Sequence, residues 1–261
     1  MQPQTDTPST APDPDALDAL IRGRRTSKRL RDPDEARTDR APLDPARRAE
    51  LDAMLAVAGE APFHRRVDDV HRGGELGSAV PWRFHVLERP ACLALLDALE
   101  ARANAEPASK WARAWKSKIP ELLAGAGALV QVTWLPDPAE GDGAGSPPAL
   151  TERNVEHVAA ASAAVQNLLL AATARGWSSY WSSGGILRDA DAFALLGIDP
   201  AQALLGAIVL GAPDAPHTRD IPGGLREERA DPASWMRKVR ADAIPGGAAQ
   251  PPSAVSSGAE S

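Results

Sequence analysis

The chain is organised around a basic segment near its start, Arg22-Gly23-Arg24-Arg25-Thr26-Ser27-Lys28-Arg29-Leu30, which we read together with Pro81-Trp82-Arg83-Phe84. The basic segment follows a short helical pattern of apolar residues, so its charged and hydroxyl groups form a compact, donor-rich site. Guanidinium groups bind phosphate oxygens in pairs, and a hydroxyl adds a short hydrogen bond. Taken alone, such a cluster is more often a solvated basic turn or a nucleic-acid patch. The rest of the chain must decide between these interpretations.

At 261 residues the chain is long enough for one large domain or two small ones, and its 43% hydrophobic residues can fill a core. The formal net charge is -6 at pH 7. An acidic chain does not suit general nucleic-acid binding, because the basic segments are outweighed elsewhere. We therefore expect no nucleic-acid partner and a local anion site.

The one cysteine, Cys92, excludes an internal disulfide framework and a CxxC metal site. A single cysteine is consistent with a reducing compartment, so we expect a cytoplasmic protein. The uncharged run Val158–Ala174 is mostly alanine and falls short of the roughly 20 strongly apolar residues of a membrane span. We expect a buried core helix there and no membrane association.

Composition divides the chain into three parts. Residues 1–15 are rich in Pro, Thr and Asp and lack the basic and apolar regions of a signal peptide, and residues 241–261 are rich in Gly, Pro, Ser and Ala. These compositions predict a disordered lead and a disordered tail. The intervening residues 16–240 show no internal repeat and no domain break, so we expect one domain.

Apolar spacing and capping residues predict the secondary structure. Helices are expected over Asp15–Arg24, Pro45–Gly59, Pro90–Ala103, Lys110–Lys118, Asn154–Arg175 and Asp189–Gly197. Strands are expected over Trp82–Leu87, Ala126–Leu135, Trp177–Trp181 and Leu204–Leu210. Loops are expected over 32–41, 65–78 and 136–148.

The glycines Gly125 and Gly127 precede a predicted strand. A dinucleotide-binding fingerprint needs its glycines after a strand and at the start of a helix. The order of elements therefore argues against a Rossmann site.

Several short motifs, taken in order, resemble the nitroreductase family of FMN-dependent NAD(P)H oxidoreductases, in its compact single-domain type. The likeness extends from Ala19 to Trp235 and rests on Arg24–Leu30, Ala61–His64, Val80–Phe84, Gln166–Leu170 with Gly176, Tyr180–Gly184 and Val209–Pro213. The resemblance implies an α+β nitroreductase-like fold, with a central, mainly antiparallel sheet flanked by helices, in a two-fold homodimer.

The resemblance also implies which residues bind the FMN cofactor. Its phosphate would be held by the opening arginines Arg24 and Arg25, by Thr26 and by Arg219, since a desolvated dianion needs about two guanidinium partners and a hydroxyl. Either Lys28 or Arg29 would lie near the N1 and O2 edge of the flavin, where positive charge stabilises the reduced ring.

The opposite edge of the flavin would meet the turn that follows the third predicted strand. Backbone amides around Ser183 and Gly184 would face O4 and N5, with Trp181 and Ser182 beside them. In this family each site lies between two subunits, so His64 would serve the flavin of the partner. A lone histidine is otherwise a surface residue, and both interpretations stay open here.

The chain departs from the family pattern at three places. Val80 stands where the family usually has glutamine, Glu60 stands where compact members have a basic residue, and residues 65–78 resemble an insertion beside the site. These differences would weaken flavin affinity or reshape the substrate pocket.

The leading hypothesis is an FMN-dependent NAD(P)H oxidoreductase that passes a hydride, by a ping-pong mechanism, to a small electron-poor acceptor such as a nitroaromatic or a quinone. The flavin carries the chemistry, so no catalytic side chain is expected. The first alternative is a non-catalytic flavin-binding or flavin-sequestering protein on the same fold. The second is a hydrolase with a metal held by His64, Asp68 and His71.

The sequence also predicts an obligate homodimer. The alanine-rich helix Asn154–Arg175 and the extended arm after Pro213 are more apolar or more extended than a monomer of this size covers.

Overall fold

The computed structural model describes residues 13–73, 75–138 and 148–240, which fall into two compact units, 13–223 and 224–240. The second unit contains two short 3-10 turns, η4 (Gly224–Glu228) and η5 (Pro232–Ser234). The predicted lead up to residue 12 and the predicted tail lie outside the described residues. The sheets and the α-helices all belong to the first unit.

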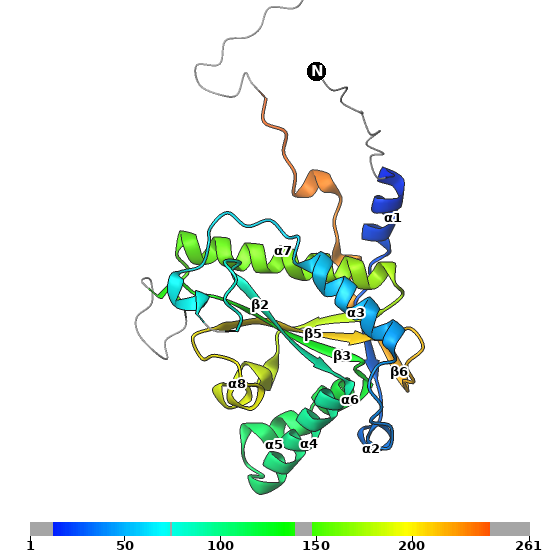
Figure 1. Cartoon of the computed structure of the whole chain (residues 1–261). Helices are drawn as coiled ribbons and strands as arrows, with labels where there is room; N and C mark the ends of the chain where they lie inside the picture. Colours follow the sequence, from blue (N-terminus) through cyan, green and yellow to red (C-terminus); the bar gives the residue numbers. More distant parts are fainter. Residues whose placement is uncertain (1–12, 74, 139–147, 241–261) are drawn as a thin grey trace, which may run out of the picture. The chain divides into compact units, whose positions relative to one another are not determined.

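A four-stranded antiparallel sheet forms the centre of the first unit (Figure 1). Its strand order is β2-β3-β5-β4. The strands are β2 (Trp82–Glu88), β3 (Ala128–Trp134), β5 (Ala203–Gly211) and β4 (Ser178–Ser182). The predicted antiparallel sheet flanked by helices is therefore confirmed, and each predicted strand lies within two residues of its observed bounds.

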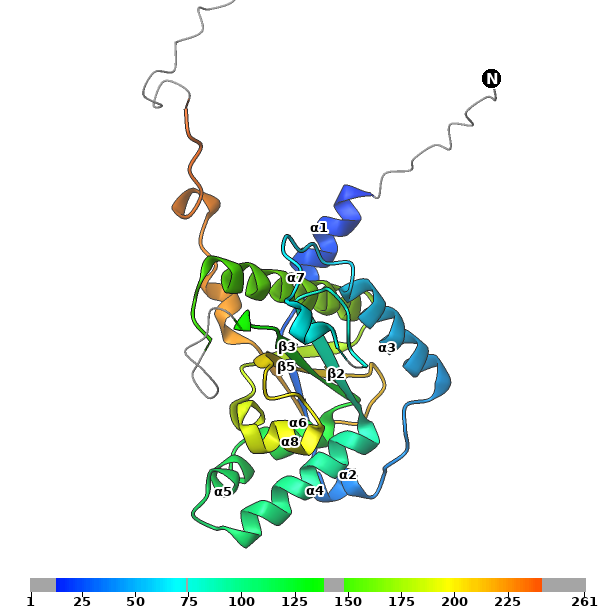
Figure 2. The same cartoon turned by 60° about the vertical axis from the view of Figure 1, so that its left-hand side comes forward.

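The central strand β3 is buried along its whole length because helices cover both faces of the sheet (Figure 2). Val130 and Val132 pack with Leu51 and Val165 on the face covered by α3 (Pro45–Ala58) and α7 (Glu152–Ala174). Leu129 points to the other face, which is covered by α4 (Arg89–Ala105), α5 (Lys110–Trp115), α6 (Ile119–Gly125) and α8 (Ala190–Leu196).

Capping residues set the helix starts, as the sequence predicts. The Asp44 carboxylate accepts the Ala46 amide at 2.9 Å at the start of α3, and Thr151 caps α7. The first helix, α1 (Pro14–Gly23), begins after Asp13 in the same way. The predicted helices are all present, with boundaries shifted by up to three residues.

Three features differ from the sequence prediction. Residues 32–41, predicted as a loop, contain the helix α2 (Pro33–Arg37), whose first turn is capped by Asp32. The helix α6 was not predicted. The basic segment, for which no strand was predicted, continues into β1 (Ser27–Leu30), which pairs antiparallel with β6 (Arg219–Pro222). A strand whose partner lies almost the whole chain away leaves no local periodicity to recognise.

The long helix α7 is apolar and long enough to cross a membrane, judged by length and composition among the described residues. Half of its most apolar window is buried within the unit, and it packs on α3 and the sheet. A core helix meets the same length and composition test, so this finding is weak evidence for a membrane span.

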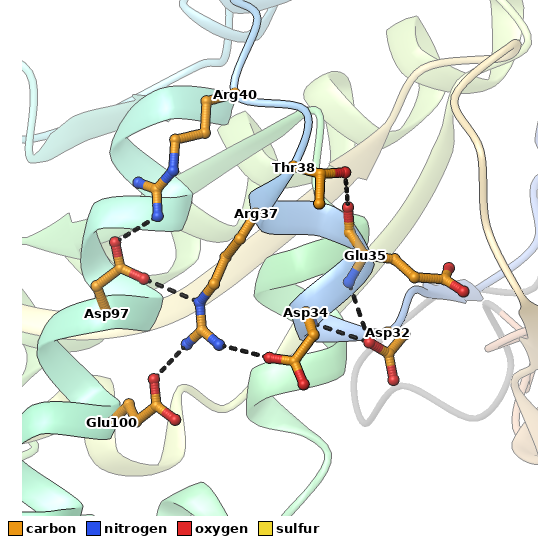
Figure 3. A network of polar contacts seen from close by, with 8 residues as sticks. All are labelled: Asp32, Asp34, Glu35, Arg37, Thr38, Arg40, Asp97 and Glu100. Atoms are coloured by element: carbon orange, nitrogen blue, oxygen red, sulfur yellow. Dashed lines mark hydrogen bonds and ion pairs between the residues drawn. The ribbon is translucent and has the colours of Figure 1, made fainter.

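Arg37 joins α2 to α4 through a network of ion pairs (Figure 3). Its guanidinium binds Asp97 at 3.0 Å, Glu100 at 2.7 Å and Asp34 at 2.9 Å, and its side chain is only 19% exposed. Arg40 binds only the second oxygen of Asp97 and is 47% exposed. Arg37 is thus a structural side chain and not a residue of an exposed loop.

We predict that Arg37→Ala lowers the free energy of unfolding by about 1–2 kcal/mol, because it removes the half-buried cation that joins Asp34 of α2 to Asp97 and Glu100 of α4. The matched control Arg40→Ala should cost about 0.5 kcal/mol or less, because Asp97 keeps Arg37. Urea denaturation of the three proteins measures both values. Equal losses would show that the network contributes nothing beyond ordinary surface pairs.

Candidate functional site

The β1–β6 ribbon lies beside β4 and brings most of the predicted cofactor residues together. In the antiparallel register, Lys28 is opposite Ile221 and Arg29 is opposite Asp220. Consecutive side chains of a strand point to opposite faces. The two neighbouring cations therefore have different surroundings.

Arg29 is a structural cation of this ribbon. Its guanidinium donates to the Ala212 carbonyl and, at 3.2 Å, to the Pro213 carbonyl, and so joins β1 to the end of β5. Its Nε is buried and lacks a hydrogen-bond partner among the described residues. Lys28 differs, since its Nζ lies 4.5 Å from the centre of the Tyr180 ring and no described carboxylate is within ion-pair distance. Of the two residues that the sequence left open, Lys28 is the one whose charge is available to a ligand.

The residues before the ribbon differ in their burial and in the hydrogen bonds that they make. Arg25 donates to the carbonyls of Arg22 and Gly23, at 2.6 and 2.9 Å, so it closes the end of α1. Arg24 is half-buried at the last position of that helix end. Thr26 is half-buried, and its hydroxyl makes no hydrogen bond to the described part of the chain. Thr26 therefore remains suited to an incoming phosphate.

Arg219 begins β6 and is opposite Leu30 in the ribbon, so it shares a face with Lys28. Its guanidinium is bound to Glu121 of α6 at 2.6 Å. A phosphate would have to share this arginine with the carboxylate.

The turn after β4 is held by its own polar groups. The Gly184 amide donates to the Ser182 hydroxyl at 3.2 Å, and Arg188 donates to the Ser183 carbonyl at 2.7 Å. Gly184 has a φ of 95°, and a Cβ there would overlap Leu204. The turn is therefore rigid, and one of the amides predicted to face a flavin is already used within it.

Trp181 lies on the opposite face of β4 from Tyr180 and Lys28. Its indole packs over Gly206, where a Cβ would overlap it, and it is 36% exposed. The structure thus does not bring Trp181 to the same side as the available cation.

A hollow of about 550 Å³ adjoins the turn. It is lined by Lys110, Arg113, Ala114, Ser117, Ile119, Gly185, Ile186, Arg188 and Asp189. Lys110 is neutralised by Asp189 at 2.6 Å. Helix α6 contacts both the hollow and the ribbon. Its Ile119 lines the hollow, and its Glu121 forms an ion pair with Arg219 of β6.

His64 lies far along the sheet from this cluster within one chain. It is exposed, and the preceding Phe63 packs edge-on against Trp82, with ring centres 5.9 Å apart. Trp82 starts β2 at the end of the sheet where β5 begins, whereas Tyr180 pairs with Val209 near the end of β5. His64 therefore lies away from Tyr180 and the ribbon in its own chain.

The metal hypothesis receives no support from the described residues, which contain no group of three or more His, Cys, Asp or Glu side chains suited to a metal ion. His71 binds the Pro136 carbonyl at 2.7 Å, and Asp68 accepts the Val70 amide at 3.0 Å. Cys92 is buried, and burial raises the pKa of its thiol to about 12. It is therefore protonated at neutral pH and is not a nucleophile.

Two residues of this region were not predicted from the sequence as site residues. The ring of Tyr180 makes a cation–π contact with the Lys28 ammonium, and Glu121 forms an ion pair with Arg219. The alternating pattern of the β4 segment signalled a strand, but neither contact has a local signature, because each partner is more than ninety positions away.

We predict that Gly184→Ala lowers the free energy of unfolding by about 2–4 kcal/mol, because strain at positive φ adds to the overlap with Leu204. Gly197 is the matched control. It also has positive φ, 64°, but a Cβ there meets nothing within 4 Å, so Gly197→Ala should cost about 1–2 kcal/mol. Thermal unfolding checks the difference, and equal costs would disprove the tight packing of the turn.

Comparisons with known proteins show which fold this chain shares. The profile described as the nitroreductase family matches residues 37–212, and no curated protein sequence matches the chain. The matched range starts after the basic segment and ends before Arg219.

Solved structures share the architecture at low identity. A nitroreductase-like protein from Bacillus cereus is 20% identical, with a TM-score of 0.56, over 85% of this chain and 95% of that one. The FMN-dependent nitroreductase NfnB from Mycobacterium smegmatis, solved in complex with NADPH, is 18% identical, with a TM-score of 0.52, over 87% and 99%. A nitroreductase from Bacteroides fragilis with bound FMN is 16% identical, with a TM-score of 0.50, over 87% and 100%.

At these identities the structural likeness shows the fold alone. The family profile, however, covers more than half of the chain, from α2 to the end of β5. The chain therefore belongs to the nitroreductase family.

Proposed function

We propose that this protein is an FMN-dependent NAD(P)H oxidoreductase that reduces a small electron-poor acceptor, such as a nitroaromatic or a quinone, by a ping-pong mechanism. The observation that carries the proposal is Lys28, a cation without a described carboxylate partner that lies on the ring of Tyr180 in β4, the strand that leads into the rigid turn. The M. smegmatis and B. fragilis relatives, solved with NADPH and with FMN, support the choice of cofactors.

The donor set fits an anionic, flat group. Arg24 and Thr26 would hold the phosphate, with Arg25 close by, and Arg219 would share its guanidinium between the phosphate and Glu121. Lys28 would face the pyrimidine edge of the ring, because Arg29 is committed to main-chain carbonyls. When bound, FMN would supply reversible hydride acceptance at N5, and the Lys28 charge would stabilise the negative charge of the reduced ring.

The turn would meet the other edge of the ring. The amides of Ser183 and Gly184 would donate to it once the Gly184 amide leaves the long bond to Ser182. Trp181, on the far face of β4, would border the site only at its rim.

A complete site would require a second copy of the chain. His64 is exposed near the start of β2, the edge strand opposite β4, so it would serve the flavin of a partner in a two-fold homodimer. The alanine-rich α7 is the proposed contact surface, with Val155 half exposed on it.

A non-catalytic flavin-binding protein is the second candidate. Two observations favour it: Val80 replaces the polar side chain expected next to the ring, and the Gly184 amide is already used. We place either protein in the cytoplasm because its one cysteine is buried and unpaired. Cell fractionation that finds the protein outside the cytoplasm would contradict this.

We predict that the purified chain binds FMN and that the flavin absorbance bleaches under NADH or NADPH and returns on adding a quinone. Light scattering of the same preparation, at low micromolar concentration, should give a dimer. A band that persists under both nucleotides supports the non-catalytic candidate, and a monomer that binds FMN normally disproves the shared site.

We predict that Arg24→Ala weakens FMN binding by about 2–4 kcal/mol, or roughly thirty-fold to a thousand-fold, and leaves riboflavin binding unchanged, because only FMN carries the phosphate. Lys28→Ala should weaken both flavins alike, because it acts on the ring. Lys116→Ala, the same loss of charge at an exposed lysine of the α5–α6 connection, is the control. The test is to measure the dissociation constants of FMN and riboflavin for the wild type and the three variants. Equal effects of all three substitutions would show that the basic segment is a solvated cluster and not a phosphate site.

A further inference from the structure

A carboxylate is already bound to one of the cations that we propose for the FMN phosphate. Nη2 of Arg219 in β6 lies 2.6 Å from Oε2 of Glu121 in α6. Within the described part of the chain, the Arg219 side chain makes no other hydrogen bond or ion pair. One side of the guanidinium is therefore committed to Glu121, and its other N–H groups are open to a ligand.

The position of Glu121 is also set by contacts that do not involve its carboxylate. The Glu121 carbonyl accepts the amide of Arg31, at 3.2 Å, directly after the last residue of β1. Gly125, one turn further along α6, packs so closely on the main chain of Arg29 that an added Cβ would overlap it. Helix α6 is therefore held against β1 at two points that remain when the carboxylate is removed.

The ion pair lies on the face of the ribbon that carries Lys28. Arg219 is opposite Leu30 in the register, and Leu30 is two positions from Lys28, so their side chains share a face. Asp220, the acidic residue of the ribbon, follows Arg219 directly and points to the opposite face. The carboxylate that meets the proposed cofactor cations is therefore that of Glu121.

A carboxylate in this position opposes the binding of a phosphate in two ways. The phosphate must share a guanidinium that already has an anionic partner, so it gains less free energy than from an unpaired arginine. The two like charges also repel each other at close range. Arg219 and Glu121 are 57% and 35% exposed, so water and salt reduce both effects without abolishing them. Riboflavin, which has no phosphate, is subject to neither.

We propose that Glu121 is a specificity-determining residue of the cofactor site. Its carboxylate competes with the phosphate of FMN for Arg219, and so lowers the preference of the chain for FMN over riboflavin. This inference rests on the proposed function, because it takes Arg219 as a phosphate partner. It also fixes the sign of the effect: removal of the carboxylate tightens FMN binding, whereas loss of a side chain that orients Arg219 for the phosphate would weaken it.

The test is to titrate FMN and riboflavin into the full chain, as wild type and as Glu121→Gln. Glutamine has nearly the same shape and keeps the main-chain bond to Arg31, so the variant should fold normally. FMN should bind about three- to ten-fold more tightly than to the wild type, and riboflavin should bind equally. Glu121→Ala should give the same gain, because the effect lies in the charge. FMN binding that is unchanged or weaker in either variant overturns the proposal.

The ion pair between Arg48 and Glu88 provides the matched control. Its closest atoms lie 2.8 Å apart, and the Glu88 side chain is 32% exposed, nearly the same as Glu121. It joins α3 to the end of β2, the edge strand opposite β4. Glu88→Gln removes the same charge from a similar pair and should change neither flavin affinity. An equal gain of FMN affinity in Glu88→Gln would reveal a general effect of net charge and overturn the role of Glu121.

The same titrations separate this inference from the proposed function. If the wild type binds FMN and the ratio of the two flavin affinities is the same in Glu121→Gln, the role of Glu121 is wrong and the cofactor site stands. If neither the wild type nor the variants bind FMN, the cofactor site is wrong and the role of Glu121 is wrong with it. Riboflavin affinity that rises together with FMN affinity places the effect on the ring and not on the phosphate, and also overturns the proposal.

Discussion

The burial of β3 on both faces is the constraint on which the rest of the structure depends. Its alternate side chains serve two different cores, Val130 and Val132 toward α3 and α7, and Leu129 toward α4 and α6. A strand that is apolar on both sides needs two layers of helices. This arrangement leaves β2 and β4 as the two edges of the sheet, and the proposed cofactor site lies at the β4 edge.

At the β4 edge, the surroundings of the two cations follow from the alternation of side chains along the four-residue strand β1. Because β1 pairs with β6, Arg29 turns to the end of β5 and satisfies main-chain carbonyls there, while Lys28 turns to Tyr180 and keeps its charge available. One register step would exchange these roles, since a one-residue slip moves every side chain to the other face. The ribbon register is therefore as important to the site as the cations themselves.

Buried and half-buried arginines each join several segments of this protein. Arg83 gives its donors to the main chain of the insertion, Arg89 to the carbonyls of Ala124 and Ala126 at the end of α6, and Arg37 to a cluster of carboxylates. Each guanidinium has several donors in fixed geometry, so one side chain can tie several segments together. These three arginines therefore serve the structure and not an anion site.

The sequence by itself determined the class of fold, the strands of the main sheet and the helix caps, because each depends on local periodicity or on residues three or four positions apart. Its motifs also pointed to the nitroreductase family, to which the profile match assigns the chain. The sequence could not predict α6, the β1–β6 pairing, or that Arg29 and not Lys28 binds main-chain carbonyls at the end of β5. Each of these depends on contacts between distant segments, and only the folded chain brings such segments within bonding distance.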